Sequence, residues 1–166
     1  MDTRSRPTPE PALKQVVVPR EHAVFWMDGR GHWHNRHGRF EHKRIIDHFI
    51  RAIRRDGDGY YVTQVRGDIC EKVYFPFEDT PLFVVRIIPP PPLRLHLNTG
   101  REIPLDPAGL YVEADHIYLR NGDERIKFAE RALLALAPYL QEGEEGGLQL
   151  SVKGSTWPIP ERSAAT

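Results

Sequence analysis

Closely spaced histidines are the residues of this chain best suited to chemistry. They stand at His32, His34, His37 and His42. On a strand, His32 and His34 would point to the same side, as two metal ligands would. The spacing is uneven and no cysteine lies nearby, so surface histidines are the favoured interpretation and we predict neither a bound metal nor a cofactor. A small metal-dependent hydrolase built on residues 32–42 stays an alternative.

Two adjacent carboxylates, Glu78 and Asp79, could serve acid–base chemistry. They stand directly before Thr80-Pro81, a combination typical of a turn. No partner nucleophile is visible in the sequence. We therefore favour the turn and keep both carboxylates as candidate ligand-binding residues.

Basic side chains form a stripe along a predicted helix over residues 41–55, at Arg44, His48, Arg51 and Arg55. Such a stripe could bind the phosphates of nucleic acid, nucleotides or lipid headgroups. Aromatic residues do not interleave it, which favours a solvated helix face. Binding of nucleic acid or another anion through this face is a further alternative.

Composition describes an ordinary globular protein of 166 residues, 40% apolar and 28% charged. No apolar run approaches the roughly 18 residues of a membrane span. The N-terminus lacks the apolar stretch of a secretion signal, and Cys70 is the single cysteine. These features predict a soluble protein of the reducing cytoplasm without an internal disulfide.

Charge is balanced over the whole chain but not along it. Residues 1–55 hold 12 Lys and Arg against 6 Asp and Glu, whereas residues 56–166 hold 11 against 17. The difference can mark an anion-binding face, two halves that attract each other, or solvated surfaces.

Hydrophobic patterning predicts an α+β protein of two similar small lobes, each with antiparallel strands and one main helix. The second helix is expected over residues 123–139, where apolar residues recur at helical spacing. Both halves show strand, turn, helix, Gly-rich turn and strand in order, which suggests an internal repeat. The predicted boundaries are a flexible tail over 1–19, a first lobe over 20–88, a proline connection over 89–92, a second lobe over 93–160 and a frayed end over 161–166.

Several short motifs occur in the order of a known bacterial family. They are Asp28-Gly29, Trp33-His34 and Gly38, then Asp58-Gly59 with Tyr61, then Glu78-Asp79-Thr80-Pro81-Leu82-Phe83. In this the chain resembles the domain of unknown function 1285 family, most strongly over residues 24–88. The resemblance implies a fold with a repeated helix-plus-strands motif, similar to pleckstrin-homology-like modules. It implies a signalling or regulatory role by analogy alone, and no catalytic residues.

No complete catalytic constellation accompanies these features, so we favour a non-enzymatic module that binds a small molecule or a protein partner. Neither the identity of the ligand nor the oligomeric state follows from the sequence. The candidate ligand-binding residues are Trp33, His34, Arg44, His48, Arg51, Arg55, Glu78 and Asp79.

Overall fold

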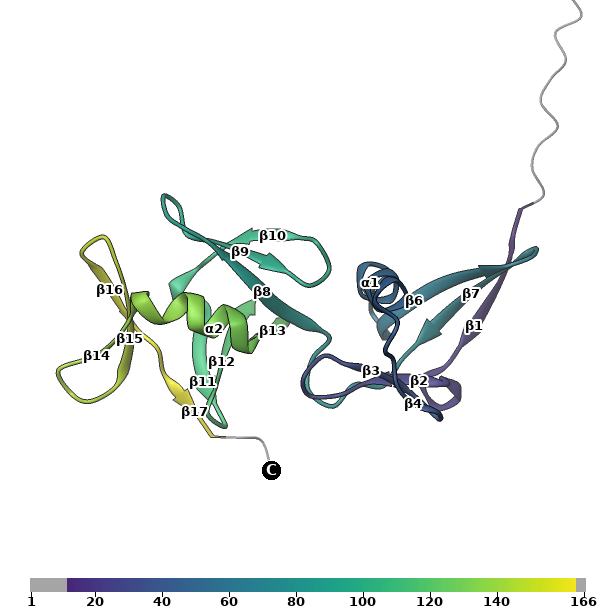
Figure 1. Ribbon diagram of the computed structural model, residues 1–166, viewed down its shortest axis with the longest axis horizontal. Coiled ribbons are helices and arrows are strands. Elements are labelled where there is room, and N and C mark those ends of the chain that lie inside the picture. Colours follow the sequence, from purple (N-terminus) through teal and green to yellow (C-terminus); the bar gives the residue numbers. More distant parts are fainter. Residues whose placement is uncertain (1–11, 164–166) are drawn as a thin grey trace, which may run out of the picture.

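A computed structural model describes residues 12–163 and shows an α+β architecture of two lobes lying side by side (Figure 1). The first lobe comprises β1 (Lys14–Val18), a 3-10 turn (Arg20–His22), β2 (Phe25–Met27), β3 (Trp33–Asn35), β4 (Gly38–Arg39), α1 (Lys43–Arg51), β5 (Arg54–Asp56), β6 (Gly59–Arg66) and β7 (Ile69–Tyr74). The predicted fold class is confirmed.

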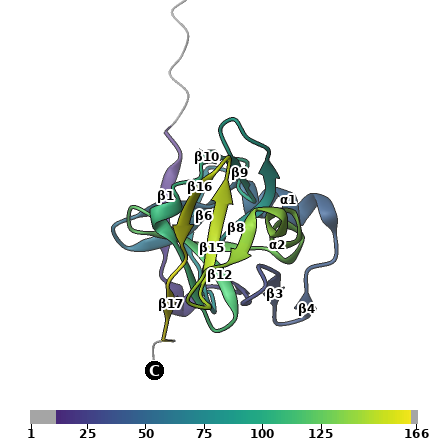
Figure 2. The same cartoon turned by 90° about the vertical axis from the view of Figure 1, so that its left-hand side faces the viewer.

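The second lobe begins with β8 (Leu82–Ile88) and runs to the C-terminal strand. It comprises β9 (Arg94–Leu97), β10 (Glu102–Pro104), a 3-10 turn (Pro107–Gly109), β11 (Leu110–Glu113), β12 (His116–Asn121), β13 (Glu124–Phe128), α2 (Glu130–Leu136), a 3-10 turn (Ala137–Tyr139), β14 (Leu140–Glu142), β15 (Leu148–Val152), β16 (Ser155–Pro158) and β17 (Glu161–Arg162). Seen from the end of this lobe, β15 and β16 lie toward the viewer (Figure 2).

Each lobe closes on its own apolar core. In the first, a sheet of order β1-β7-β6-β5 and the small sheet β2-β3-β4 enclose an aromatic cluster with α1. In the second, α2 packs on a seven-stranded sheet of order β10-β9-β8-β13-β12-β11-β17, next to the sheet β14-β15-β16. No helix within residues 12–163 is long and apolar enough to cross a membrane.

Strand pairing places β8 in the second lobe, whereas the sequence placed it in the first. β8 pairs antiparallel with β9 and parallel with β13. The prolines 89–92 therefore join two neighbouring strands of one sheet. The side chain of Phe83 on β8 nevertheless packs in the first lobe's core, so this strand contributes to both cores. That the two lobes are independent units with the predicted boundaries remains a prediction.

Both helices are shorter than their apolar patterns indicated. Arg54 and Arg55, expected at the end of the first helix, form β5 together with Asp56, because the turn at Gly57-Asp58 folds them back on β6. Residues 124–128, expected in the second, form β13, which lies between β8 and β12 with Ile126 and Phe128 buried. Here neighbouring strands outweigh local helical spacing.

The predicted tails are also partly ordered. β1 pairs in parallel with β7, as a short edge strand, and β17 pairs with β11. Residues 1–11 and 164–166 of the two predicted tails lie outside the described residues.

Candidate functional site

A short hairpin, β2 and β3, sets one aromatic side chain on the surface of the first lobe. Phe25 and Met27 point into the core, so the residue between them, Trp26, points outward and is 37% exposed. The register places Trp26 opposite His34, and their rings stack with centroids 5.6 Å apart and planes 11° apart. The indole is therefore held in one orientation although it faces solvent.

Asp28, in the turn after β2, fixes the histidine. One carboxylate oxygen accepts hydrogen bonds from the backbone N–H groups of Arg30, at 2.8 Å, and His32, at 3.0 Å. The other lies 2.7 Å from Nε2 of His34. Burial opposes ionisation of Asp28, but the hydrogen bonds from His34 and the two backbone groups outweigh it and lower the pKa to about 2. The ionised Asp28 thus accepts the Nε2 proton of His34 and leaves Nδ1 as that ring's second polar atom.

Glu78 completes an open pocket beside this stack. Its Oε2 accepts a hydrogen bond from the backbone N–H of Gly29 at 2.8 Å. Backbone hydrogen bonds between Met27 and residues 76 and 78, each 3.0 Å long, hold the two segments together. The pocket has a volume of about 590 Å³ and is lined by Trp26, Asp28, Gly29, Arg30, His34 and Glu78. We call it the Trp26 pocket.

Asp79, the second predicted carboxylate, has a different environment. It accepts hydrogen bonds from Tyr118 at 2.6 Å and Arg125 at 3.0 Å, and it pairs with Lys127 at 3.1 Å. Burial opposes ionisation of Asp79, but these three partners outweigh it and lower its pKa. Arg125 also pairs with Glu113 at 2.6 Å. The carboxylate of Asp79 is therefore bound by side chains of the second lobe.

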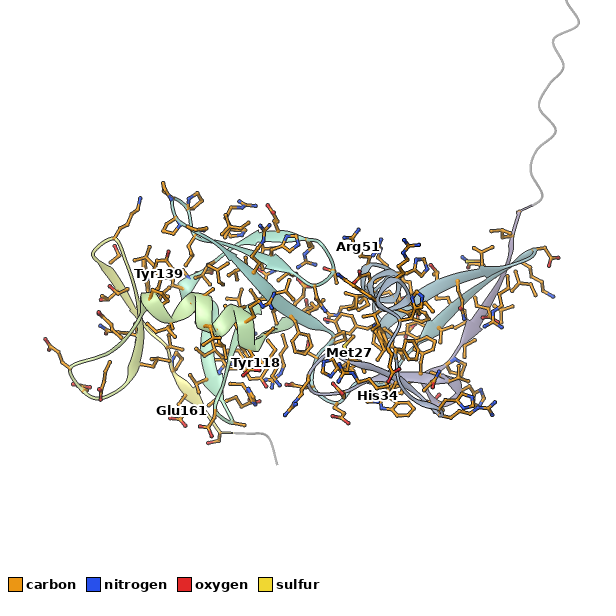
Figure 3. All side chains as sticks on the ribbon, in the orientation of Figure 1. Met27, His34, Arg51, Tyr118, Tyr139 and Glu161 are labelled. Carbon is orange, nitrogen blue, oxygen red and sulfur yellow. The ribbon has the colours of Figure 1, made fainter. Side chains whose placement is uncertain are left out.

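The predicted basic stripe does not form one surface. Arg44, His48 and Arg51 are exposed on α1, but the helix ends at Arg51 and Arg55 lies on β5. There Arg55 forms a two-pronged ion pair with Asp123 of the second lobe, with distances of 2.8 and 3.0 Å. Figure 3 shows Arg51 on the upper side of the first lobe and His34 on the lower side, so these candidates do not share a site.

The predicted histidine cluster is divided as well. His32 and His34 both approach Asp28, at 3.6 and 2.7 Å, whereas His37 and His42 line a separate depression. Within residues 12–163 no group of three or more histidine, cysteine, aspartate or glutamate side chains is arranged to hold a metal ion.

Trp33 belongs to the core of the first lobe. It is 1% exposed and packs edge-on against Phe25, Phe49 and Phe75, with centroids 4.8 to 5.7 Å away. It therefore supports the hairpin from below and does not line the Trp26 pocket, because alternation turns it to the opposite side from His34.

Of the predicted site residues, the structure brings His34 and Glu78 together. Sequence reasoning missed Trp26, Asp28, Gly29 and Arg30 as partners in that pocket. One signal was available: in the run Phe25-Trp26-Met27, a strand that buries the outer two residues exposes the tryptophan.

Comparison with solved structures shows what this fold resembles. The crystal structure of a DUF1285 family protein from Silicibacter pomeroyi DSS-3 matches with a TM-score of 0.59 and 14% identity, over 93% of this chain and 89% of that chain. A DUF1285 family protein from Shewanella baltica OS155 matches with a TM-score of 0.48 and 16% identity, over 69% of this chain and 91% of that one. No family model and no curated protein matches.

The first match defines a class of protein: an α+β protein with a DUF1285-like fold. The resemblance noted from the short motifs is thereby confirmed at the level of the fold.

Proposed function

We propose that the protein is a non-enzymatic binding module that holds a small ligand in the Trp26 pocket. The observation that carries this proposal is the fixed orientation of a surface tryptophan. Trp26 contributes little to either core, yet His34 stacks on it and Asp28 holds His34. Aromatic side chains fixed in this way offer a preorganised surface for a flat ring, because less entropy is lost in ordering them on binding.

The polar groups left over in the pocket define the ligand's chemistry. Arg30 forms no ion pair within the described part of the chain, so its guanidinium is available for an anionic group. Glu78 uses Oε2 for Gly29 and can accept a donor at Oε1. A small planar compound with one acidic substituent and one N–H or O–H donor matches the ring of Trp26, the guanidinium of Arg30 and the free oxygen of Glu78.

The composition of the pocket wall disfavours covalent catalysis by a hydroxyl, thiol or amine side chain. Its six lining residues include no hydroxyl, thiol or amine side chain that could act as a nucleophile. Asp28 and His34 form a pair that could take a proton from a water molecule, so hydrolysis by an activated water is the alternative function of this pocket.

The family resemblance implies a regulatory role, and the position of the Trp26 pocket is consistent with one. Glu78 lines the pocket, and the next residue, Asp79, binds Tyr118, Arg125 and Lys127 of the second lobe. A ligand that contacts Glu78 would therefore act on the segment that joins the lobes.

A fragment screen by amide NMR tests the proposal. The probes are small aromatic carboxylic acids and their uncharged amides, added to the isotope-labelled full chain. We expect the acids to shift amide signals of residues 26–34 and 78, and the amides to bind more weakly. Trp26→Ala and Arg30→Gln should remove these shifts, whereas Leu134→Ala and Arg131→Gln, both at exposed positions of α2, should not. Shifts that persist in Trp26→Ala, or no shifts with any acid, would contradict the proposal.

A further inference from the structure

The segment over residues 35–54 carries an excess of positive charge that is not paired with carboxylates, although Arg54 donates hydrogen bonds to the carbonyl oxygens of Arg51 and Ile53. It contains six basic residues, Arg36, Arg39, Lys43, Arg44, Arg51 and Arg54, against the two acidic residues Glu41 and Asp47. None of these eight side chains takes part in an ion pair with another residue in 12–163.

A groove with an apolar floor lies within this basic segment, where the β3–β4 hairpin meets the start of α1. It has a volume of about 390 Å³. Apolar side chains of Phe40, Ile45 and Phe49 line it, together with the basic or titratable side chains of His37, Arg39 and His42 and the carboxylate of Glu41. Ile45 is 46% exposed, a large apolar side chain left partly open to solvent. We call this the hairpin–helix groove.

The floor of the groove is continuous with the first lobe's core. The ring of Phe49 packs edge-on against Phe40 at 5.5 Å, Phe25 at 5.2 Å and Trp33 at 5.6 Å. These contacts fix the shape of the floor. The groove is therefore a formed depression that can take an apolar side chain without rearrangement of the backbone.

We propose that the hairpin–helix groove is a docking site for an acidic protein segment that inserts one apolar anchor side chain. Charge complementarity selects the partner, since Arg39 lines the depression and Arg36, Lys43 and Arg44 adjoin its lining residues in the chain, against the single carboxylate of Glu41. The apolar floor selects the anchor, since covering Ile45 and the edges of Phe40 and Phe49 removes apolar area from water.

Nucleic acid and membrane surfaces fit this groove less well. Single-stranded nucleic acid is held by ring faces on which bases stack, but Phe40 and Phe49 contact each other edge to face. A membrane surface favours apolar side chains that protrude beyond the cations, whereas Phe40 and Phe49 are only partly exposed and line a depression. A protein segment can supply both a protruding apolar side chain and fixed carboxylates.

This site is separate from the Trp26 pocket, because the two share no lining residue. Failure of one proposal leaves the other standing.

The test uses a defined probe, a fluorescein-labelled synthetic peptide Glu-Asp-Glu-Leu-Glu-Asp-Glu, and measures fluorescence anisotropy with the full chain. We expect the peptide with glycine in place of leucine to bind at least about fivefold more weakly, because the anchor's burial is lost. Affinity should also fall several-fold between about 50 and 300 mM salt, as screening weakens charge pairs.

Matched variants locate the contact. Arg39→Gln and Ile45→Ser should each weaken binding by about three- to tenfold. The control variants Arg131→Gln and Leu134→Ser remove an exposed arginine and an exposed apolar side chain from α2. They should leave the affinity for the peptide unchanged. Equal binding of the leucine and glycine peptides, no binding of either, or an equal loss in the α2 variants would overturn the proposal. So would tighter binding of duplex DNA or of phosphatidylserine vesicles than of the leucine peptide.

Discussion

The ammonium group of Lys127 donates a hydrogen bond to the carbonyl oxygen of Gly29 at 2.9 Å, although 98 positions separate the two residues. Lys127 lies on β13 of the second lobe, and Gly29 lies in the turn of the β2–β3 hairpin. The same ammonium group pairs with Asp79, and the N–H of Gly29 is held by Glu78. One peptide segment of the first lobe is thus fixed from both sides at the junction of the lobes.

Replacing Lys127 should destabilise the protein. Its side chain is nearly buried, so Lys127→Met leaves the carbonyl of Gly29 without its donor and removes one cation from Asp79, which keeps Tyr118 and Arg125 as partners. We expect the free energy of unfolding to fall by about 2–4 kcal/mol, measured by urea denaturation. Lys43→Met, at an exposed position of α1, is the control and should change it by less than about 0.5 kcal/mol. Similar losses in both variants would contradict the assigned role of Lys127.

Gly31 should tolerate no larger residue. Its φ is +84°, and a Cβ atom there would lie 2.9 Å from the ring of Phe83 on β8. Gly31→Ala therefore adds a clash to backbone strain, and we expect a loss of about 2–4 kcal/mol in thermal or chemical unfolding. Gly100 has a similar φ of +93° but open space around it, so Gly100→Ala should cost only about 1 kcal/mol. Equal costs would show that the contact with Phe83 does not matter.

Acid should remove the contribution of Asp28 over a defined pH range. The pKa of this carboxyl is about 2 in the folded chain against 3.8 for the ordinary group. Because the folded pKa is the lower one, the stabilisation is complete above about pH 4 and is lost as the pH falls toward about 2. The difference in unfolding free energy between the wild type and Asp28→Asn should therefore shrink over this interval. Asp68→Asn, which removes an exposed carboxylate without side-chain partners in residues 12–163, is the control. A difference that stays constant from pH 5 to pH 2 would contradict the assignment.

Two ion pairs at the lobe junction should differ in strength. Arg55 and Asp123 are 36% and 81% exposed, so a double-mutant cycle with Arg55→Met and Asp123→Asn should give a weak coupling that declines with salt. Arg125 and Asp79 are 33% and 18% exposed, and Arg125 also stacks over Tyr118 at 3.9 Å. Their cycle should give about 1–3 kcal/mol. A stronger coupling at Arg55 would reverse this order.

Local pattern in the sequence determined much of the first lobe. Alternation in Phe25-Trp26-Met27 decided which side chain faces solvent, and the four-residue spacing of Ile46 and Ile50 decided the inner face of α1. The opposite net charges of the two halves allowed for an attraction between them, and the ion pair of Arg55 with Asp123 realises one such contact.

Tertiary structure decided the rest, because the deciding contacts join residues far apart in the chain. Residues 124–128 have an apolar pattern that is compatible with a helix or a strand. They form a strand because their backbone pairs with both β8 and β12. The roles of Glu78 and Asp79 diverged in the same way. The two carboxylates are adjacent in the sequence, but Glu78 faces the Trp26 pocket and Asp79 is enclosed by Tyr118, Arg125 and Lys127. Neighbours along the chain carry no information on such partners, which only the docking of the two lobes supplies.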